Sequence, residues 1–193
     1  MSRTSQTTRT MVFIALYAAM TIVLNFVKDL IPFTSVWANG GSINISLIPL
    51  VFASIHLGCR YGVITCLLEL LVSVIIGTTK LYFAPYNPVL GILCDYIIPV
   101  AIMGLSSMFM KKGGDEKRNI IALEVGIFLC TAIRIISQIV SGVYCWSDAG
   151  ELGSVAAWIF SLKYNLGYGL PTLIMLMLVM PLIYKIFRNK IEK

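Results

Sequence analysis

Residues 86–99 read Tyr-Asn-Pro-Val-Leu-Gly-Ile-Leu-Cys-Asp-Tyr-Ile-Ile-Pro and place one carboxylate in the middle of an apolar run from Leu81 to Met110. An acid at that depth in a bilayer costs a few kcal/mol or more, so it normally faces a polar cavity or a partner. Asp95 is therefore expected to meet a cationic or hydrogen-bonding group.

The composition on either side of this stretch is that of a membrane protein. Of the 193 residues, 58% are hydrophobic and only 12% are charged, whereas soluble domains carry about 25% charged residues. A helix that crosses the hydrocarbon core needs roughly 20 apolar residues. The sequence predicts an all-α integral membrane protein, one membrane domain over residues 1–193, with six transmembrane helices at about 11–31, 43–59, 61–79, 86–110, 119–143 and 154–187.

The net charge of +6 is explained by membrane topology. With a cytoplasmic N-terminus, the outside segments keep only Lys28 and Lys80 as basic residues, beside three acids. This asymmetry is the positive-inside pattern, and it predicts both termini in the cytoplasm. No nucleic-acid partner is needed to explain the basic residues of the inside segments, which are Arg3, Arg9, Arg60, Lys111, Lys112, Lys117, Arg118, Lys185, Arg188, Lys190 and Lys193.

Polar side chains follow one face of each of the last two predicted helices. Arg134, Gln138 and Ser141 share a face by helical spacing, as do Ser161, Asn165 and Tyr168. With the aromatic residues at the outer ends, these faces predict a site for a flat, heteroaromatic, cationic small molecule, because aromatic rings and a carboxylate both attract cations. The candidate residues are Trp37, Tyr86, Asp95, Tyr96, Gln138, Trp146, Tyr164 and Asn165.

For several of these residues a structural role is an equal alternative. Trp37 is as consistent with anchoring at the membrane interface as with stacking on a ligand, and Asn165 is as consistent with joining helices. Glu69 is expected to pair with Arg134 or Lys163 rather than to bind the ligand directly.

The small residues Ala15 and Ala19 on the first predicted helix allow another helix to approach closely. That helix lies either in the same chain or in a partner, and the sequence favours neither. A solvated or headgroup-facing role is expected for His56, the only histidine.

The sequence offers no catalytic residues. The single histidine leaves no His-based dyad at the outer face, and the five scattered cysteines show no metal-binding spacing, so no metal or other cofactor is expected. No G-x-x-x-x-G-K-[ST] loop is present for using ATP. A small integral-membrane enzyme acting on lipid or isoprenoid is the competing class, and it needs paired acids or a histidine at one bilayer face.

Five motifs in this order resemble a known family. They are Asn39-Gly-Gly-Ser-Ile43, Asp95-Tyr96, Ser141-Gly142 followed by Trp146, Ser161-Leu-Lys-Tyr-Asn165, and Tyr168 with Pro171. Together they resemble the thiamine-specific substrate-binding (S) component of energy-coupling factor (ECF) vitamin transporters, over nearly the whole chain.

The resemblance implies a six-helix bundle in a bacterial-type cell membrane that binds thiamine at its outer face and docks onto a transmembrane T subunit and two ATPases. Asp95 then takes the acidic ligand position, and Tyr96 the neighbouring aromatic one. Trp37 and Trp146 take stacking positions, and Asn165 binds the pyrimidine. Ala15 and Ala19 match the small-residue motif that faces the T subunit.

The sequence departs from the family pattern at three places. Gln138 stands where the pattern has a histidine, Phe160 stands where it has a tyrosine, and the run from Pro88 to Asp95 is about one residue longer. A thiamine precursor or analogue, or another vitamin, is therefore the alternative ligand.

Overall fold

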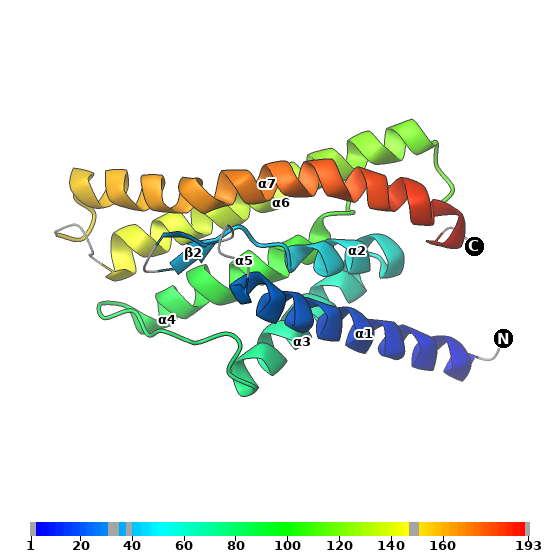
Figure 1. Cartoon of the computed structure of the whole chain (residues 1–193), viewed down its shortest axis with the longest axis horizontal. Coiled ribbons are helices and arrows are strands. Elements are labelled where there is room, and N and C mark those ends of the chain that lie inside the picture. The colour runs from blue at the N-terminus through cyan, green and yellow to red at the C-terminus, as the bar shows by residue number, and fades with distance from the viewer. Residues whose placement is uncertain (1–2, 31–34, 38–39, 147–150, 192–193) are drawn as a thin grey trace.

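The computed structural model describes residues 3–30, 35–37, 40–146 and 151–191. Over these residues it shows six helices and a short β-hairpin, which confirms the predicted all-α class (Figure 1). The elements are α1 (Arg3–Leu30), β1 (Ser35–Trp37), β2 (Gly40–Ser42), α2 (Leu47–Leu57), α3 (Cys59–Ile75), a segmented helix made of α4 (Pro88–Ile92), η2 (Leu93–Ile97), α5 (Ile98–Ala101) and η3 (Ile102–Leu105), then α6 (Glu116–Ser141) continued by η4 (Gly142–Trp146), and α7 (Val155–Ile191).

Four helical stretches among the described residues are long and apolar enough to cross a membrane: Ser5–Lys28, Pro88–Leu105, Glu116–Trp146 and Val155–Lys190. The sequence predicts two further crossings, at 43–59 and 61–79. Helix α3 in the second has 17 residues, whereas helix α2 in the first has 11 residues, or about 16 Å, which is shorter than the hydrocarbon core of about 30 Å. Helix α2 begins at Leu47, after a turn in which the Leu47 amide donates to the Asn44 carbonyl at 3.4 Å, and it ends at Gly58, whose φ of 86° breaks the helix before α3.

The strand pairing in the hairpin and the start of α4 both depend on local residues. Ser35 pairs with Ser42, and Trp37 with Gly40, in an antiparallel register. Gly41, within β2, has a φ of 75°, which glycine adopts without strain. Asn87 caps α4 by accepting a hydrogen bond from the Leu90 amide at 3.2 Å, and Pro88 occupies the first turn, where its missing N–H costs nothing.

The core joins α2, α3, α6 and α7. Leu50, Val51, Ile127 and Leu176 are all at most 1% exposed and belong to one cluster. A second, smaller cluster of Ile135, Ile139 and Val143 lies farther along α6. The larger core supports the half of the bundle that carries the termini, and the smaller one lies beneath the candidate site described below.

The outer surface is apolar, as a bilayer requires. Ile75, Val155 and Ile186 are each more than 70% exposed. The start of α1 and the end of α7 lie at the same end of the bundle, whereas α4 and the turn before α7 lie at the other (Figure 1). The two termini therefore lie on the same side of the bundle (Figure 1).

Candidate binding site

Asp95 is held by two donors from the neighbouring helix. Its Oδ2 accepts a hydrogen bond from Ser141 Oγ at 2.7 Å and one from Trp146 Nε1 at 2.8 Å. Ser141 is the last residue of α6 and Trp146 the last of η4. The group that Asp95 meets within the chain is thus a pair of neutral donors, and the described residues make no hydrogen bond to its Oδ1.

Both sides of this contact lie in π-helical turns. Asp95 lies within η2, and Trp146 ends η4. A π turn accommodates one extra residue in an α-helix and is frequent at functional sites. The turn at η2 offers a physical account of the extra residue between Pro88 and Asp95, because it absorbs an insertion without breaking the helix.

Helices α6 and α7 approach closely beside Asp95. A Cβ added at Gly142 would lie 2.3 Å from Ser161 Oγ, so only glycine fits there. Ser161 Oγ in turn donates to the Ile139 carbonyl at 2.9 Å. This contact fixes the polar face of α7 against the end of α6.

Asn165 is buried, 3% exposed, and finds its partners on its own helix. Its Nδ2 donates to the Ser161 carbonyl at 2.9 Å and to Ser161 Oγ at 3.2 Å, and its Oδ1 accepts from the Tyr168 hydroxyl. Ser161, Asn165 and Tyr168 therefore do share one face of α7, as predicted, and they are hydrogen-bonded to one another. A ligand that binds Asn165 would have to replace some of these bonds.

Aromatic rings continue this face. Tyr164 stacks on Phe160 with centroids 6.1 Å apart and meets Tyr168 edge-on at 5.7 Å. Both strands of the hairpin pack against α7, and the Asn44 amide donates to Thr172 Oγ1 at 3.1 Å. Trp37 ends β1, and its side chain lies outside the described residues.

Tyr96 and Tyr86, both predicted to bind the ligand, have other contacts in this structure. The Tyr96 hydroxyl accepts from the Tyr82 amide at 2.9 Å and donates to the Lys80 carbonyl at 3.2 Å, so it fastens the loop after α3. Tyr86 is 60% exposed, and its amide donates to the Cys145 carbonyl at 3.3 Å. Of the predicted residues, Asp95 and Trp146 are thus joined by a hydrogen bond at the end of α6, and Asn165 lies close to Gly142 there, 3.9 Å from a Cβ built at that glycine.

One face of α6 carries polar atoms without partners. In the described part of the chain, the buried atoms Thr131 Oγ1, Arg134 Nη1 and Gln138 Oε1 make no hydrogen bond. Buried unpaired polar atoms are rare in native proteins and require an explanation. Gln138 lies one turn below Ser141, so its Oε1 is an acceptor available to a ligand's N–H group.

The prediction that Glu69 forms an ion pair with Arg134 or Lys163 is wrong. Glu69 Oε1 accepts instead from Asn25 Nδ2 at 3.2 Å and from Ser73 Oγ at 2.7 Å. Within the described residues Arg134 makes no ion pair with it, and Lys163 is exposed. The hydrogen-bond partners of the carboxylate are therefore Asn25 of α1 and Ser73, one turn along α3.

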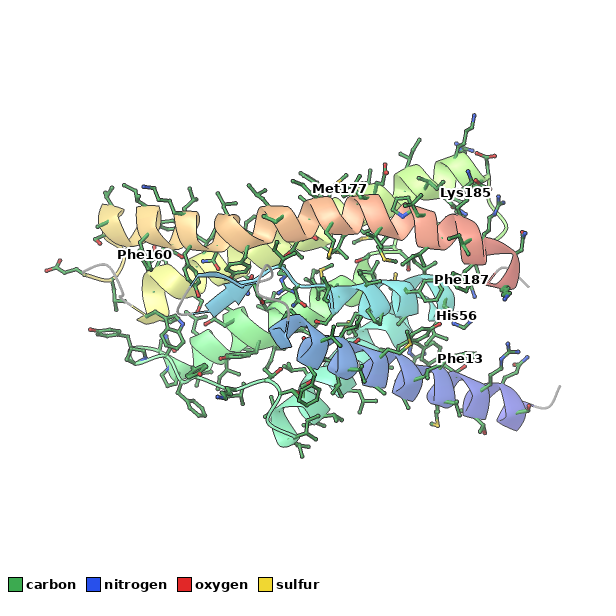
Figure 2. All side chains as sticks on the ribbon, in the orientation of Figure 1. Phe13, His56, Phe160, Met177, Lys185 and Phe187 are labelled. Carbon is green, nitrogen blue, oxygen red and sulfur yellow. The ribbon has the colours of Figure 1, made fainter. Side chains whose placement is uncertain are left out.

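His56 is less solvated than expected. It is half-buried, its Nδ1 lies 2.7 Å from the Tyr17 hydroxyl, and its ring meets Phe13 edge-on at 4.6 Å. Figure 2 shows Phe13, His56 and Phe187 at the end of the bundle with the termini, far from Phe160. The histidine thus lies in an aromatic cluster remote from Asp95.

Sequence reasoning missed Ser141 as a direct partner of Asp95. The signal was present, because Ser141 lies three residues after Gln138 on the same polar face. Ser137 was also missed: its Oγ donates to the Cys94 carbonyl at 2.7 Å and joins α6 to the π turn.

The fold and this geometry define a class: a multi-pass helical membrane protein with a candidate recognition site for a small cation. The described residues include no group of three or more histidine, cysteine or acidic side chains placed to hold a metal ion.

Comparison with known proteins places the chain within that class. The model of the thiamine transporter protein family matches residues 11–192, so the chain belongs to this family of ECF S components, which are transporters and not enzymes. Thiamine transporter ThiT of Bacillus subtilis (strain 168) is 30% identical over 190 residues, covering 95% of this chain and 94% of the relative. The structure of ThiT from Listeria monocytogenes superposes with a TM-score of 0.75 at 20% identity, covering 95% of this chain and 97% of that one.

Proposed function

We propose that the protein is the thiamine-binding S component of an ECF-type importer, which captures its substrate at the outer face and relies on separate ATPase subunits for energy. The observation that carries this proposal is the Asp95 carboxylate, held by Ser141 and Trp146 beside an aromatic face, in a member of the thiamine transporter family.

The chemistry of thiamine suits this arrangement. Its thiazolium is a permanent cation, and its pyrimidine carries an amino group. The Trp146 ring supplies a face for the cation, and such contacts are worth about 2 kcal/mol or more when desolvated. The unpaired Gln138 Oε1 is available to accept from an amino group, and Asp95 supplies the negative charge.

The partner surface and the topology follow from the same proposal. Ala15 and Ala19 are exposed on α1, whereas Ala18 is buried, so the small-residue pair faces outward, available to a T subunit. With both termini in the cytoplasm, by the positive-inside pattern, Asp95 belongs to the outer half of the bundle. Two ATPase subunits supply the energy, since the sequence lacks a P-loop motif.

Titration of the purified protein in detergent with thiamine tests the proposal. We expect saturable quenching of tryptophan fluorescence at micromolar or lower thiamine, and weaker binding of the separate aminopyrimidine and thiazole halves. Tighter binding of the aminopyrimidine half than of thiamine identifies a precursor transporter. No response to thiamine, together with quenching by another vitamin, refutes thiamine as the substrate.

A further inference from the structure

A cavity that includes none of the candidate site residues lies at the end of the bundle that carries the termini. It has a volume of about 200 Å³ and is lined by residues of the α2–α3 corner and the segment after η3, together with Asn119 of α6 and Tyr184 of α7. Its walls include Gly58, Cys59, Ser107, Met108, Lys111 and Lys112. Neither the sequence motifs nor the proposed transport role accounts for it.

Buried hydrogen bonds fix the walls of this cavity. Asn119, 3% exposed, accepts from the Lys111 amide at 3.0 Å and donates to the Lys111 carbonyl at 2.8 Å and to the Tyr184 hydroxyl at 3.0 Å. Ser107 Oγ donates to the Ser54 carbonyl at 2.7 Å. These bonds hold the backbone at Lys111, and the side chains of Asn119 and Ser107 are already paired.

The charge of the cavity is positive and uncompensated. Lys111 and Lys112 make no ion pair with any described residue, and no acidic residue lines the cavity. The nearby acids of α6 have other roles: Glu116 pairs with Arg188 at 3.1 Å, and Asp115 caps the helix by accepting from the Arg118 amide. The fixed walls and the two ammonium groups thus favour a compact anion.

An apolar surface adjoins the lysines. Met108 is 40% exposed and Phe109 is 47% exposed. A free phosphate gains nothing from such a surface, whereas an acyl chain buries it. An anionic group with an attached hydrocarbon chain matches both features at once.

We propose that this cavity binds the headgroup phosphate of an anionic phospholipid, with Lys111 and Lys112 on the phosphate and the acyl chains over Met108 and Phe109. Basic pockets between helices at the membrane surface are known to hold such headgroups. Lysines elsewhere at this end, such as Lys117 and Lys185, are exposed but do not line the cavity.

A matched pair of double variants tests the proposal on the full chain in neutral detergent. K111Q/K112Q removes two charges from the cavity, and K117Q/K185Q removes two charges from the same end outside it. Binding of phosphatidylglycerol is followed by native mass spectrometry and by the rise in thermal midpoint, with phosphatidylcholine and inorganic phosphate as comparisons. Size-exclusion chromatography verifies that both variants fold.

We expect wild type and K117Q/K185Q to retain phosphatidylglycerol alike, and K111Q/K112Q to bind it about 10- to 30-fold more weakly. Phosphatidylcholine and inorganic phosphate should leave the midpoint unchanged. Equal losses in the two double variants overturn the proposal, because general surface charge then explains the binding. A shift with inorganic phosphate as large as with the lipid also overturns it, since the site then holds a free anion.

Discussion

At the scale of single residues, Asp95 keeps a carboxylate inside an apolar helix because two donors reach one of its oxygens. The bonds from Ser141 Oγ and Trp146 Nε1 are 2.7 and 2.8 Å long, and hydrogen bonds that donate to a carboxylate favour its charged form. They orient the carboxylate and leave its charge available to a cation.

Replacing Asp95 with Asn should weaken thiamine binding about 10- to 100-fold, since an interaction with a charged group is worth about 1.5–3 kcal/mol. The side chain keeps its size but loses the charge that faces the cation. Fluorescence titration measures the change. Asp115→Asn is the control, because it removes an acid at the other end of the bundle and leaves a good helix cap. Unchanged affinity in Asp95→Asn refutes the role of the charge.

Gln138→Leu should separate binding from stability. Its Oε1 is buried without a partner in the free protein, and such an atom costs about 1–3 kcal/mol. We expect the ligand-free thermal midpoint to stay or rise while thiamine affinity falls. A midpoint lowered by several degrees, with affinity intact, contradicts the assignment of Gln138 to the ligand.

At the scale of elements, glycines determine how closely the helices approach. A Cβ added at Gly104 would lie 2.4 Å from the Val63 amide nitrogen, and one at Gly62 would lie 2.6 Å from the Gly104 carbonyl oxygen. Small residues at helix contacts are the usual device for close packing in membranes. Here they join η3 to α3 and thereby position the segmented helix that carries Asp95.

Gly104→Ala should therefore destabilise the protein by about 1–3 kcal/mol or more, because backbone atoms cannot move aside. Gly169→Ala is the matched variant. A Cβ there would meet the end of the Ile135 side chain at 2.7 Å, and that side chain can adjust. Thermal unfolding in detergent should show a larger loss for Gly104→Ala. The reverse order contradicts the packing described for η3.

At the scale of the whole molecule, α1 has two different faces. Tyr17 and Ala18 are buried against the bundle, whereas Met11, Val12 and Met20 are exposed beside Ala15 and Ala19. The exposed face lies along the outside of the bundle, where a bilayer or another subunit covers it. Binding at the outer half and docking through α1 therefore use different surfaces.

Ala15→Trp should leave thiamine binding intact and abolish uptake in cells, because the bulky ring blocks the approach of the T subunit. Ala18→Trp, on the buried face, should instead prevent folding. Titration of the purified variants and uptake of labelled thiamine by cells that express the partner subunits measure the two effects. Lost binding in folded Ala15→Trp, or normal uptake, contradicts docking through this face.

Sequence alone determined what depends on local spacing and composition. Long apolar runs predicted an all-helical membrane protein, because a helix forms all of its backbone hydrogen bonds within one segment, as the water-free bilayer core requires. The spacing of Gln138 and Ser141 predicted a shared face, because helical periodicity is local. The isolation of Asp95 in an apolar run marked it as a residue in need of a partner.

Only the tertiary structure decided which partners those residues find. Asn25 donates to Glu69 across 44 positions, the Tyr96 hydroxyl donates to the Lys80 carbonyl, and α2 begins only at Leu47. The π turns that contain Asp95 and Trp146 could not be predicted from the spacing of apolar residues in the sequence. These features depend on contacts between segments distant in the chain, and their energies come from packing that no local pattern encodes.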